Sequence, residues 1–375
     1  MTKKLLIFHP ALAPYRVDQF NSLSQMFDLE VVFMFNNVWN HNFDQSKLLS
    51  QLQFKVSFLL IGPGYKGKVF RFGMLKAIKA FNPDIILGYE YSFTTQYLIL
   101  LRRFGFIRQK IGSTIDDSIE ICNHIQSKTR RFARKHTVKK LDYLVVLSSE
   151  VSQYYEDCFN LKEHQIIVSP ILQNPERLRN NPNELERLAE EYTLKYQLKG
   201  KKVLLFVGRF IPEKALPRFI RSIYSILLEQ KKVVVVLVGN GEDKLNIEAF
   251  IKDKQLENQV LLPGRYEGPE LFAWYLCASG FILPSTYEPF GAVVNEALIF
   301  GLKVFCSKYA GASYLIHSYN GILFDPLIEK QTIDKLNYFL HSINLISSIE
   351  LMNKPSLIDN YQDDFIKEWR KLIDE

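Results

Sequence analysis

Residues 280–297 read GFILPSTYEPFGAVVNEA. The apolar run Gly280–Pro284 predicts a short buried strand, and the residues after Gly291 predict a helix. Two carboxylates, Glu288 and Glu296, lie eight residues apart around the start of that helix. Backbone N–H groups at a helix start attract phosphate, and carboxylates accept hydrogen bonds from hydroxyls, so the stretch favours a site for a phosphorylated sugar. Helix capping by acidic residues is the alternative, and it explains Glu288 more easily than Glu296.

Strand-like runs alternate with helical stretches on both sides of this segment. Most of the runs are short, apolar and rich in β-branched residues. The predicted strands are Leu5–Phe8, Leu29–Phe35, Phe54–Leu60, Asp84–Gly88, Lys110–Ser113, Tyr143–Ser148, Lys202–Val207, Val233–Val238, Gln259–Leu262 and Lys303–Ser307. The predicted helices include Tyr15–Met26, Met74–Phe81, Thr95–Phe104 and Glu184–Tyr196. This alternation indicates an α/β protein with parallel, doubly wound sheets.

A length of 375 residues favours two domains. Residues 173–183 are rich in Pro, Asn and Arg and lack hydrophobic periodicity, so we predict the domain linker there. The first domain is then expected over residues 1–178 and the second over residues 179–357. A closing amphipathic helix is expected within about residues 358–375, and we assign it to the first domain.

Hydrophobic residues make up 47% of the chain and charged residues 23%, which is typical of a globular protein with a substantial core. The four cysteines are scattered and have no metal-ligand spacing, so reduced thiols are expected. The N-terminal apolar run is too short for a signal peptide, and no run of about 20 apolar residues predicts a membrane span. We therefore expect a cytoplasmic protein.

A second constellation follows the predicted strand Lys202–Val207 and contains Gly208, Arg209 and Lys214. Gly208 permits a sharp turn at the carboxyl end of a strand, where ligands bind in open α/β sheets. Arg209 and Lys214 can converge on one anion, and a diphosphate leaving group needs such charge as its bond breaks. The P-loop pattern is absent. A solvated basic loop is the alternative.

The stretch Gly239-Asn240-Gly241 follows the valine-rich strand Val233–Val238. A turn that begins the next helix is the favoured interpretation. The other interpretation is that a backbone N–H of this stretch, at Gly239, faces a ligand.

Together these motifs resemble the retaining glycosyltransferases of family 4, which have the GT-B fold. The matching motifs, in the family's order, are Gly208-Arg209 with Lys214, Gly239-Asn240-Gly241, Pro284-Ser285, Glu288-Pro289-Phe290-Gly291, Glu296-Ala297, Gly311 and Asn320-Gly321. They cover the second half of the chain. The resemblance implies two Rossmann-like domains that face each other across a cleft, with a C-terminal helix that crosses back to the first domain.

The resemblance also implies a donor site for a nucleotide-diphosphate sugar, UDP- or GDP-linked. The implied donor residues are Gly208, Arg209, Lys214, Gly239, Arg265, Phe290, Gly291 and Glu296, with Arg209, Lys214 and Glu288 taking part in catalysis. The basic pair would bind the diphosphate and Glu296 the ribose, Arg265 would lie near the base, and Glu288, Phe290 and Gly291 would contact the sugar. Because the basic pair neutralises the leaving group in this family, no metal or other cofactor is expected, and no Asp-x-Asp element is evident.

The first half departs from the family pattern at two places. The loop before Arg16 has no Gly-rich segment, and Asp116 and Asp117 stand where many members have a His. Asp116 or Asp117 can accept an acceptor proton or stabilise an oxocarbenium ion, and a helix N-cap is the alternative for each. Arg16 is interpreted as a contact to the donor phosphate or the acceptor, or as a plain helix-start arginine. Glu90, at a strand end, is interpreted as an acceptor contact, as is Asp117.

Residues 61–140 carry 16 Lys and Arg against 5 Asp and Glu, although the whole chain has a net charge of only +7. Basic residues interleaved with aromatics suit an anionic membrane surface, solvated helix faces are the alternative, and no nucleic-acid-binding motif accompanies them. The predicted function is sugar transfer, with retention, to a glycan or lipid-linked oligosaccharide in surface polysaccharide biosynthesis, peripheral to the membrane. A non-hydrolysing sugar-nucleotide epimerase of the same fold and a non-catalytic partner subunit are the alternatives.

Overall fold

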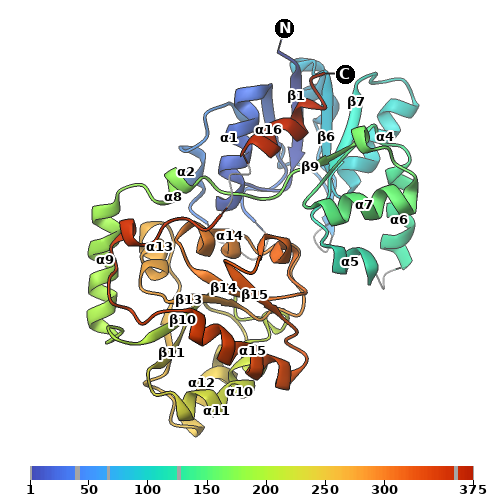
Figure 1. Cartoon of the computed structure of the whole chain (residues 1–375). Helices are drawn as coiled ribbons and strands as arrows, with labels where there is room; N and C mark the ends of the chain where they lie inside the picture. Colours follow the sequence, from blue (N-terminus) through green and yellow to red (C-terminus); the bar gives the residue numbers. More distant parts are fainter. Residues whose placement is uncertain (1, 39–42, 66–67, 125–127, 359–361, 375) are drawn as a thin grey trace. The chain divides into compact units, whose positions relative to one another are not determined.

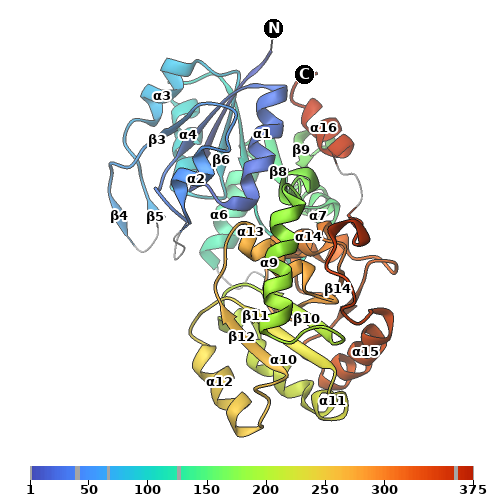
Figure 2. The ribbon, with the colours of Figure 1, turned by 90° about the vertical axis from the view of Figure 1, so that its left-hand side faces the viewer.

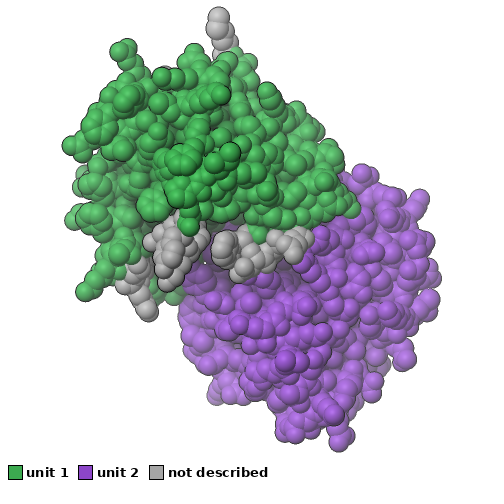
Figure 3. All heavy atoms as spheres, turned by 180° about the vertical axis from the view of Figure 1, so that it is seen from behind, with its two compact units in different colours: residues 1–173, 360–375 green, residues 174–359 purple. Residues whose placement is uncertain are grey.

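The computed structural model describes residues 2–38, 43–65, 68–124, 128–358 and 362–374. The chain divides into two compact units, unit 1 (residues 1–173 and 360–375) and unit 2 (residues 174–359), coloured separately in Figure 3. The boundary therefore lies a few residues before the one we predict at 178/179. The stretch predicted as an irregular linker contains two helix starts, Pro175 and Pro182, because proline at the first helical position is already set in a helical φ.

Unit 1 is built on a parallel sheet of seven strands in the order β3-β2-β1-β6-β7-β8-β9. Its strands are β1 (Lys4–His9), β2 (Asp28–Phe33), β3 (Val56–Phe58), β6 (Ile85–Tyr89), β7 (Lys110–Thr114), β8 (Tyr143–Val146) and β9 (Ile166–Val168). A two-stranded antiparallel hairpin, β4 (Gly64–Tyr65) and β5 (Lys68–Val69), stands apart from this sheet. Neither this hairpin nor β9 is predicted from the sequence, because these strands are too short to show a pattern.

Helices cover both faces of the unit 1 sheet (Figures 1 and 2). They are α1 (Val17–Met26), α2 (Gln45–Leu49), α3 (Met74–Phe81), α4 (Phe93–Arg103), α5 (Ile119–Asn123), α6 (Lys128–Val138), α7 (Ser149–Phe159) and α16 (Gln362–Arg370). Successive residues of β1 point to opposite faces, so Leu6 packs in one core with α3, α4 and α7, and Leu5 packs in the other with α1 and α16.

Unit 2 has a parallel sheet of six strands in the order β12-β11-β10-β13-β14-β15. The strands are β10 (Lys202–Val207), β11 (Val233–Val238), β12 (Val260–Gly264), β13 (Gly280–Leu283), β14 (Lys303–Ser307) and β15 (Gly321–Phe324). The helices are α8 (Pro175–Leu178), α9 (Pro182–Lys195), α10 (Leu216–Ser222), α11 (Tyr224–Glu229), α12 (Lys244–Asp253), α13 (Pro269–Leu276), α14 (Ala292–Ile299) and α15 (Glu329–Ser342). The predicted architecture of two parallel, Rossmann-like sheets is confirmed.

In each sheet the strand order reverses next to the first strand. The reversal lies between β1 and β6 in unit 1, and between β10 and β13 in unit 2, where Leu204 pairs with Gly280. Loops that leave the carboxyl ends of such neighbouring strands run in opposite directions and leave room for a ligand. We therefore expect unit 2 to bind a ligand at the residues that follow β10 and β13. Unit 1 is expected to bind one at the residues that follow β1 and β6.

The C-terminal helix α16 packs on unit 1, as predicted. Trp369 is 1% exposed, and its indole N–H donates to the Ser169 hydroxyl at 3.0 Å. The Val168 N–H donates to the Glu368 carboxylate at 2.8 Å. The start of the predicted helix, residues 359–361, lies outside the described residues.

Within the residues that the structure describes, no helix combines the length and the apolar character that crossing a membrane requires.

Candidate active site

Three glycine loops of unit 2 meet at the edge of the sheet where β10, β11 and β12 end. Gly208 follows β10 with a φ of 154°, and Gly239 follows β11 with a φ of 150°. The N–H of Gly239 donates to the carbonyl of Gly264 at 2.8 Å. A Cβ on Gly239 would stand 1.9 Å from the carbonyl oxygen of Gly208, so these loops can approach only with glycine at position 239. The predicted donor residues Gly208 and Gly239 are therefore neighbours.

The segment Gly239-Asn240-Gly241 links β11 to α12, as the favoured interpretation describes, and a contact between its backbone and a ligand stays a prediction. The Phe210 N–H donates to the Asn240 carbonyl, and the Asp243 N–H donates to the Phe210 carbonyl, both at 2.9 Å. A Cβ on Gly241 would lie 2.3 Å from the Phe210 carbonyl oxygen. The turn therefore fixes the loop that follows β10.

Lys214 and Glu288 form an ion pair at the strand-order reversal of unit 2. Their side chains are only 14% and 12% exposed. The loops that carry them are joined where the Thr286 N–H donates to the Glu213 carbonyl at 2.8 Å. Arg209, in the same loop as Lys214, is exposed. We predict that Arg209 and Lys214 converge on one anion. In the structure Lys214 contacts Glu288, so an anion that binds Lys214 must compete with this carboxylate.

The turn from Glu288 to Gly291 leads into α14. Gly291 has a φ of 93° and precedes the helix, whose first N–H groups have no side-chain cap. The Glu288 carbonyl accepts the Gly311 N–H at 2.9 Å. A Cβ on Gly311 would stand 1.9 Å from the Pro289 carbonyl oxygen, which gives the predicted motif residue Gly311 a structural reason. The Phe290 side chain is 4% exposed. Any contact that Phe290 makes with a sugar therefore comes from its backbone.

Glu296 lies on the second turn of α14 and is 8% exposed. Its Oε2 accepts the hydroxyl of Tyr275, on α13, at 2.6 Å. Burial, with Glu296 beside it, raises the pKa of Tyr275 well above its usual range. Tyr275 is not among the site residues predicted from the sequence. The signal available was one hydroxyl in the apolar helix Pro269–Leu276, which needs a partner when it is buried.

Arg265 follows the carboxyl end of β12 and is exposed. It forms an ion pair with Glu267. The next residue, Tyr266, packs against Tyr192 and Trp274 at ring-centroid distances of 5.6 and 5.8 Å. The contact between Arg265 and a nucleotide base stays a prediction.

In unit 1, Arg16 lies beside β1 and points inward. It is 2% exposed, and its Nη2 donates to Asp116 Oδ2 at 2.5 Å while its Nη1 donates to Gln19 at 2.5 Å. The Tyr89 hydroxyl donates to the same Asp116 oxygen at 3.3 Å. The predicted contact of Arg16 with a donor phosphate or an acceptor does not fit this burial. Arg16 instead fixes Asp116.

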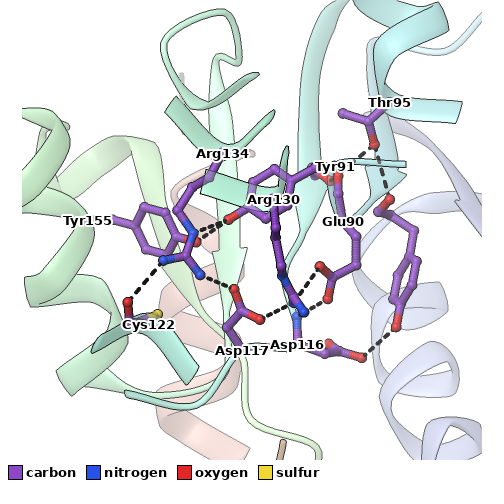
Figure 4. Close-up of polar contacts among 11 residues, drawn as sticks. Glu90, Tyr91, Thr95, Asp116, Asp117, Cys122, Arg130, Arg134 and Tyr155 are labelled. Carbon is purple, nitrogen blue, oxygen red and sulfur yellow. Dashed lines mark hydrogen bonds and ion pairs between the residues drawn. The ribbon is translucent and has the colours of Figure 1, made fainter. Parts of the chain in front are cut away.

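Asp117 points away from its neighbour Asp116, into the protein interior (Figure 4). It is fully buried, and its two oxygens accept from Arg130 and Arg134, each at 2.5 Å. The Arg134 guanidinium also lies 5.6 Å from the ring centroid of Tyr155. The predicted acceptor role of Asp117 does not fit this burial, because both of its oxygens are used to join α6 to the sheet.

Glu90 follows β6 at the strand-order reversal of unit 1 and has a φ of 53°, which is strained for a residue with a Cβ. Its side chain is 21% exposed. Oε1 accepts the Asp116 N–H at 3.2 Å, and Oε2 accepts from Arg130 at a longer 3.4 Å. Burial, followed by repulsion from Asp117 and Asp116, raises the pKa of Glu90 to about 8. This shift favours the protonated form of the carboxyl group.

In the described part of the chain, no three His, Cys, Asp or Glu side chains come close enough together to hold a metal ion.

Residues 189–350, all within unit 2, match the glycosyl transferases group 1 family. A 2-deoxystreptamine N-acetyl-D-glucosaminyltransferase of Niallia circulans is 27% identical over 169 residues, which are 45% of this chain and 43% of that protein. The chain spans about half the length of the curated relatives it matches. The resemblance inferred from the motifs is confirmed at the level of this family.

Solved structures share the fold over the whole length. Sucrose-phosphate synthase of Thermosynechococcus elongatus superposes with a TM-score of 0.69 at 16% identity, over 99% of each chain. HepE of Anabaena, solved with UDP and glucose, superposes with a TM-score of 0.69 at 17% identity, over 99% of this chain and 98% of that one. The predicted GT-B fold is confirmed.

Proposed function

We propose, on the premise that residues 189–350 form a glycosyl transferases group 1 domain, that the protein transfers a glycosyl group from a nucleotide-diphosphate sugar. The donor is UDP- or GDP-linked, and the acceptor is a glycan or a lipid-linked oligosaccharide of surface polysaccharide biosynthesis. The observation that carries the proposal is the ion pair of Lys214 and Glu288 at the strand-order reversal of unit 2, with Arg209 exposed on the same loop.

Lys214 and Glu288 separate when the donor binds. The diphosphate takes Lys214 and Arg209, since a phosphate offers more negative charge and more acceptor oxygens than one carboxylate. Glu288 is then beside the uncapped start of α14, where it accepts a hydroxyl of the sugar. Because Arg209 and Lys214 supply the positive charge, we expect the reaction to proceed without a bound metal ion.

The transfer retains the anomeric configuration. The bond between the anomeric carbon and the diphosphate oxygen breaks, and its electron pair leaves with the diphosphate. The acceptor oxygen bonds to the anomeric carbon on the same face and gives its proton to the departing diphosphate. In this scheme unit 2 supplies position and charge, which typically accounts for most of such catalysis.

Other residues of unit 2 complete the donor site in this proposal. Glu296, held by Tyr275, accepts the ribose hydroxyls, and Arg265 lies beside the base. The backbone of Phe290 and Gly291 faces the sugar. In unit 1, Asp116 and Glu90 are the carboxyl groups proposed to meet the acceptor.

Transfer of labelled sugar from UDP- and GDP-linked donors tests the proposal. Lys214→Ala should reduce kcat at least about 100-fold, the usual effect of removing one charged stabiliser of a leaving group. Lys231→Ala is the matched control, because Lys231 is exposed and lies at the opposite, amino end of β11. Transfer by Lys214→Ala at the parent rate would refute the site. A converted nucleotide sugar released without any acceptor would indicate an epimerase instead.

The helices on one face of unit 1 expose basic and aromatic side chains. On α6, Lys135 is exposed and Phe132 is 70% exposed, and Lys139 is exposed just after the end of this helix. On and after α4, Arg103 and Phe104 are exposed. Further exposed basic and aromatic residues on, next to and between α3, α4 and α6 are Phe72, Lys76, Lys79, Phe93, Phe106, Arg108 and Lys128, and we call the whole set the basic face. Lys66, another lysine of the basic region 61–140, lies outside the described residues. We propose that this basic face binds an anionic membrane surface, which brings a lipid-linked acceptor to the enzyme, since each Lys or Arg near such a surface contributes about 1 kcal/mol.

Cosedimentation with vesicles tests the membrane proposal. The protein should bind anionic vesicles at low salt, and the bound fraction should fall as added salt screens the charges. Lys135→Glu with Lys139→Glu should weaken binding, whereas Lys231→Glu with Lys232→Glu in unit 2 should not. Equal binding to neutral vesicles, or none to anionic ones, would refute this part.

A further inference from the structure

A small cavity lies inside unit 1, between β1, α1, β7 and α16. Its lining includes His9, Arg16, Thr114 and Trp369. About 10 Å³ of it is open to the centre of a water molecule. A cavity needs about this much space to hold one water, and it needs polar partners on its wall.

Two polar atoms of residues that line the cavity have no hydrogen-bond partner within the described part of the chain. They are His9 Nε2 and Arg16 Nε. Both residues are deeply buried, with exposed fractions of 7% and 2%. A buried donor or acceptor that makes no hydrogen bond is strongly destabilising, and such groups in native proteins are nearly always paired.

The hydrogen bonds fix which of the two atoms donates. His9 Nδ1 lies 3.1 Å from the Ala11 carbonyl oxygen, which can only accept, so Nδ1 carries the ring proton. Burial, followed by the charge of Arg16, lowers the pKa of His9 to about 3, so the ring is neutral. Its Nε2 is therefore an acceptor, whereas Arg16 Nε–H is always a donor. Two residues that line one cavity thus carry an unpaired acceptor and an unpaired donor.

We infer that one water molecule occupies this cavity, accepts a hydrogen bond from Arg16 Nε–H and donates one to His9 Nε2. Thr114 also lines the cavity, and its hydroxyl can serve as a third partner. One water can accept from Arg16 Nε–H and donate to His9 Nε2 at the same time. A group that only donates, or one that only accepts, could satisfy just one of these two atoms.

The water completes the support of Asp116. Arg16 already donates through Nη1 to Gln19 and through Nη2 to Asp116. With Nε bound to the water, the guanidinium is held along its whole edge, so its plane cannot turn. His9 is then a positioning residue that acts on Asp116 through the water and Arg16. The water site itself does not depend on the proposed sugar transfer.

A high-resolution crystal structure of the full chain tests the inference directly. The electron density should show one water within about 2.7–3.2 Å of both His9 Nε2 and Arg16 Nε. An empty cavity, or a direct contact between the two side chains, would overturn it. In solution, the Arg16 Nε–H proton should show a nuclear Overhauser effect to a long-lived water, and exchange of that proton as fast as for an exposed arginine would contradict the site.

Two variants of one residue separate the water from simple packing. In His9→Gln the amide oxygen can replace Nε2, and in His9→Asn the amide N–H can replace only Nδ1. The water and the orientation of Arg16 should therefore survive in His9→Gln and be lost in His9→Asn. Retention of the water in both variants, or its loss in both, would refute the role assigned to Nε2, and neither result depends on catalytic activity.

Discussion

The burial of His9 predicts that unit 1 loses stability as the pH falls from 6.5. The ring is 7% exposed and packs edge-on against Phe20 and Tyr89, at centroid distances of 5.4 and 5.2 Å. Burial, with the charge of Arg16, lowers its pKa from 6.5 to about 3. In the unfolded chain His9 therefore binds a proton below pH 6.5, whereas in the folded chain it does so only below about pH 3. Between these values the unfolded state binds more protons, so the free energy of unfolding falls with falling pH.

The size of the effect follows from the two pKa values. Between pH 7.5 and pH 5, the His9 contribution to the free energy of unfolding should fall by about 2 kcal/mol. Glu90 acts in the opposite direction, because its raised pKa lets the folded chain bind more protons than the unfolded chain below pH 8. The wild type and His9→Gln both contain Glu90, so its contribution cancels when the two proteins are compared. For each protein the free energy of unfolding at pH 5 is compared with its own value at pH 7.5, so a difference in packing between the two proteins also cancels.

Urea unfolding read by hydrogen–deuterium exchange in peptides that cover β1 reports on unit 1 alone. The wild type should lose about 2 kcal/mol more than His9→Gln when the pH is lowered from 7.5 to 5. The same loss in both proteins would refute the reasoning, because it would mean that the His9 ring titrates in the folded protein as it does in the unfolded one.

Three further predictions concern single contacts. Trp369→Ala should destabilise unit 1 by about 3–5 kcal/mol in urea unfolding, because a fully buried indole leaves a cavity under α16, and a cost below about 1 kcal/mol would contradict that packing. Gly239→Ala should cost about 1–3 kcal/mol and weaken nucleotide binding in a calorimetric titration, whereas Gly105→Ala, where a Cβ meets no atom within 4 Å, should leave binding unchanged. Tyr275→Phe removes a donor from Glu296 and should cost about 1–3 kcal/mol in thermal unfolding, so equal stability would argue against that bond.

The sequence predicts the strands of the unit 2 sheet other than β15, and it predicts parts of unit 1 less well. Strands β10, β11 and β14 begin and end where predicted, because β-branched and apolar runs with sharp boundaries define them. The strands β9 and β15 have only three and four residues, too few to show a period of two. The predicted elements also omit α6, whose buried face has only three residues in a strongly charged helix.

The candidate site shows the same division between local and distant information. The motif around Glu288 and the glycines after β10 and β11 are local, so the sequence predicts them. The partner of Lys214 lies 74 residues away and that of Glu296 lies 21 residues away, and no spacing rule pairs them. Asp116 and Asp117 are adjacent, yet one faces Arg16 and the other is buried by arginines of α6. Only the packing of α6 decides which of the two is accessible.

Binding of nucleoside diphosphates tests the central claim most directly, because it needs neither the acceptor nor the sugar to be known. Thermal unfolding should be measured with uridine, guanosine and adenosine diphosphates, for the wild type, Lys214→Ala and the control Lys231→Ala. One of the three should stabilise the wild type and the control, by about 2.7 kcal/mol at 100 times its Kd, and should fail to stabilise Lys214→Ala. If none of them stabilises the wild type, or if Lys214→Ala is stabilised equally, the donor site is not at the ion pair of Lys214 and Glu288.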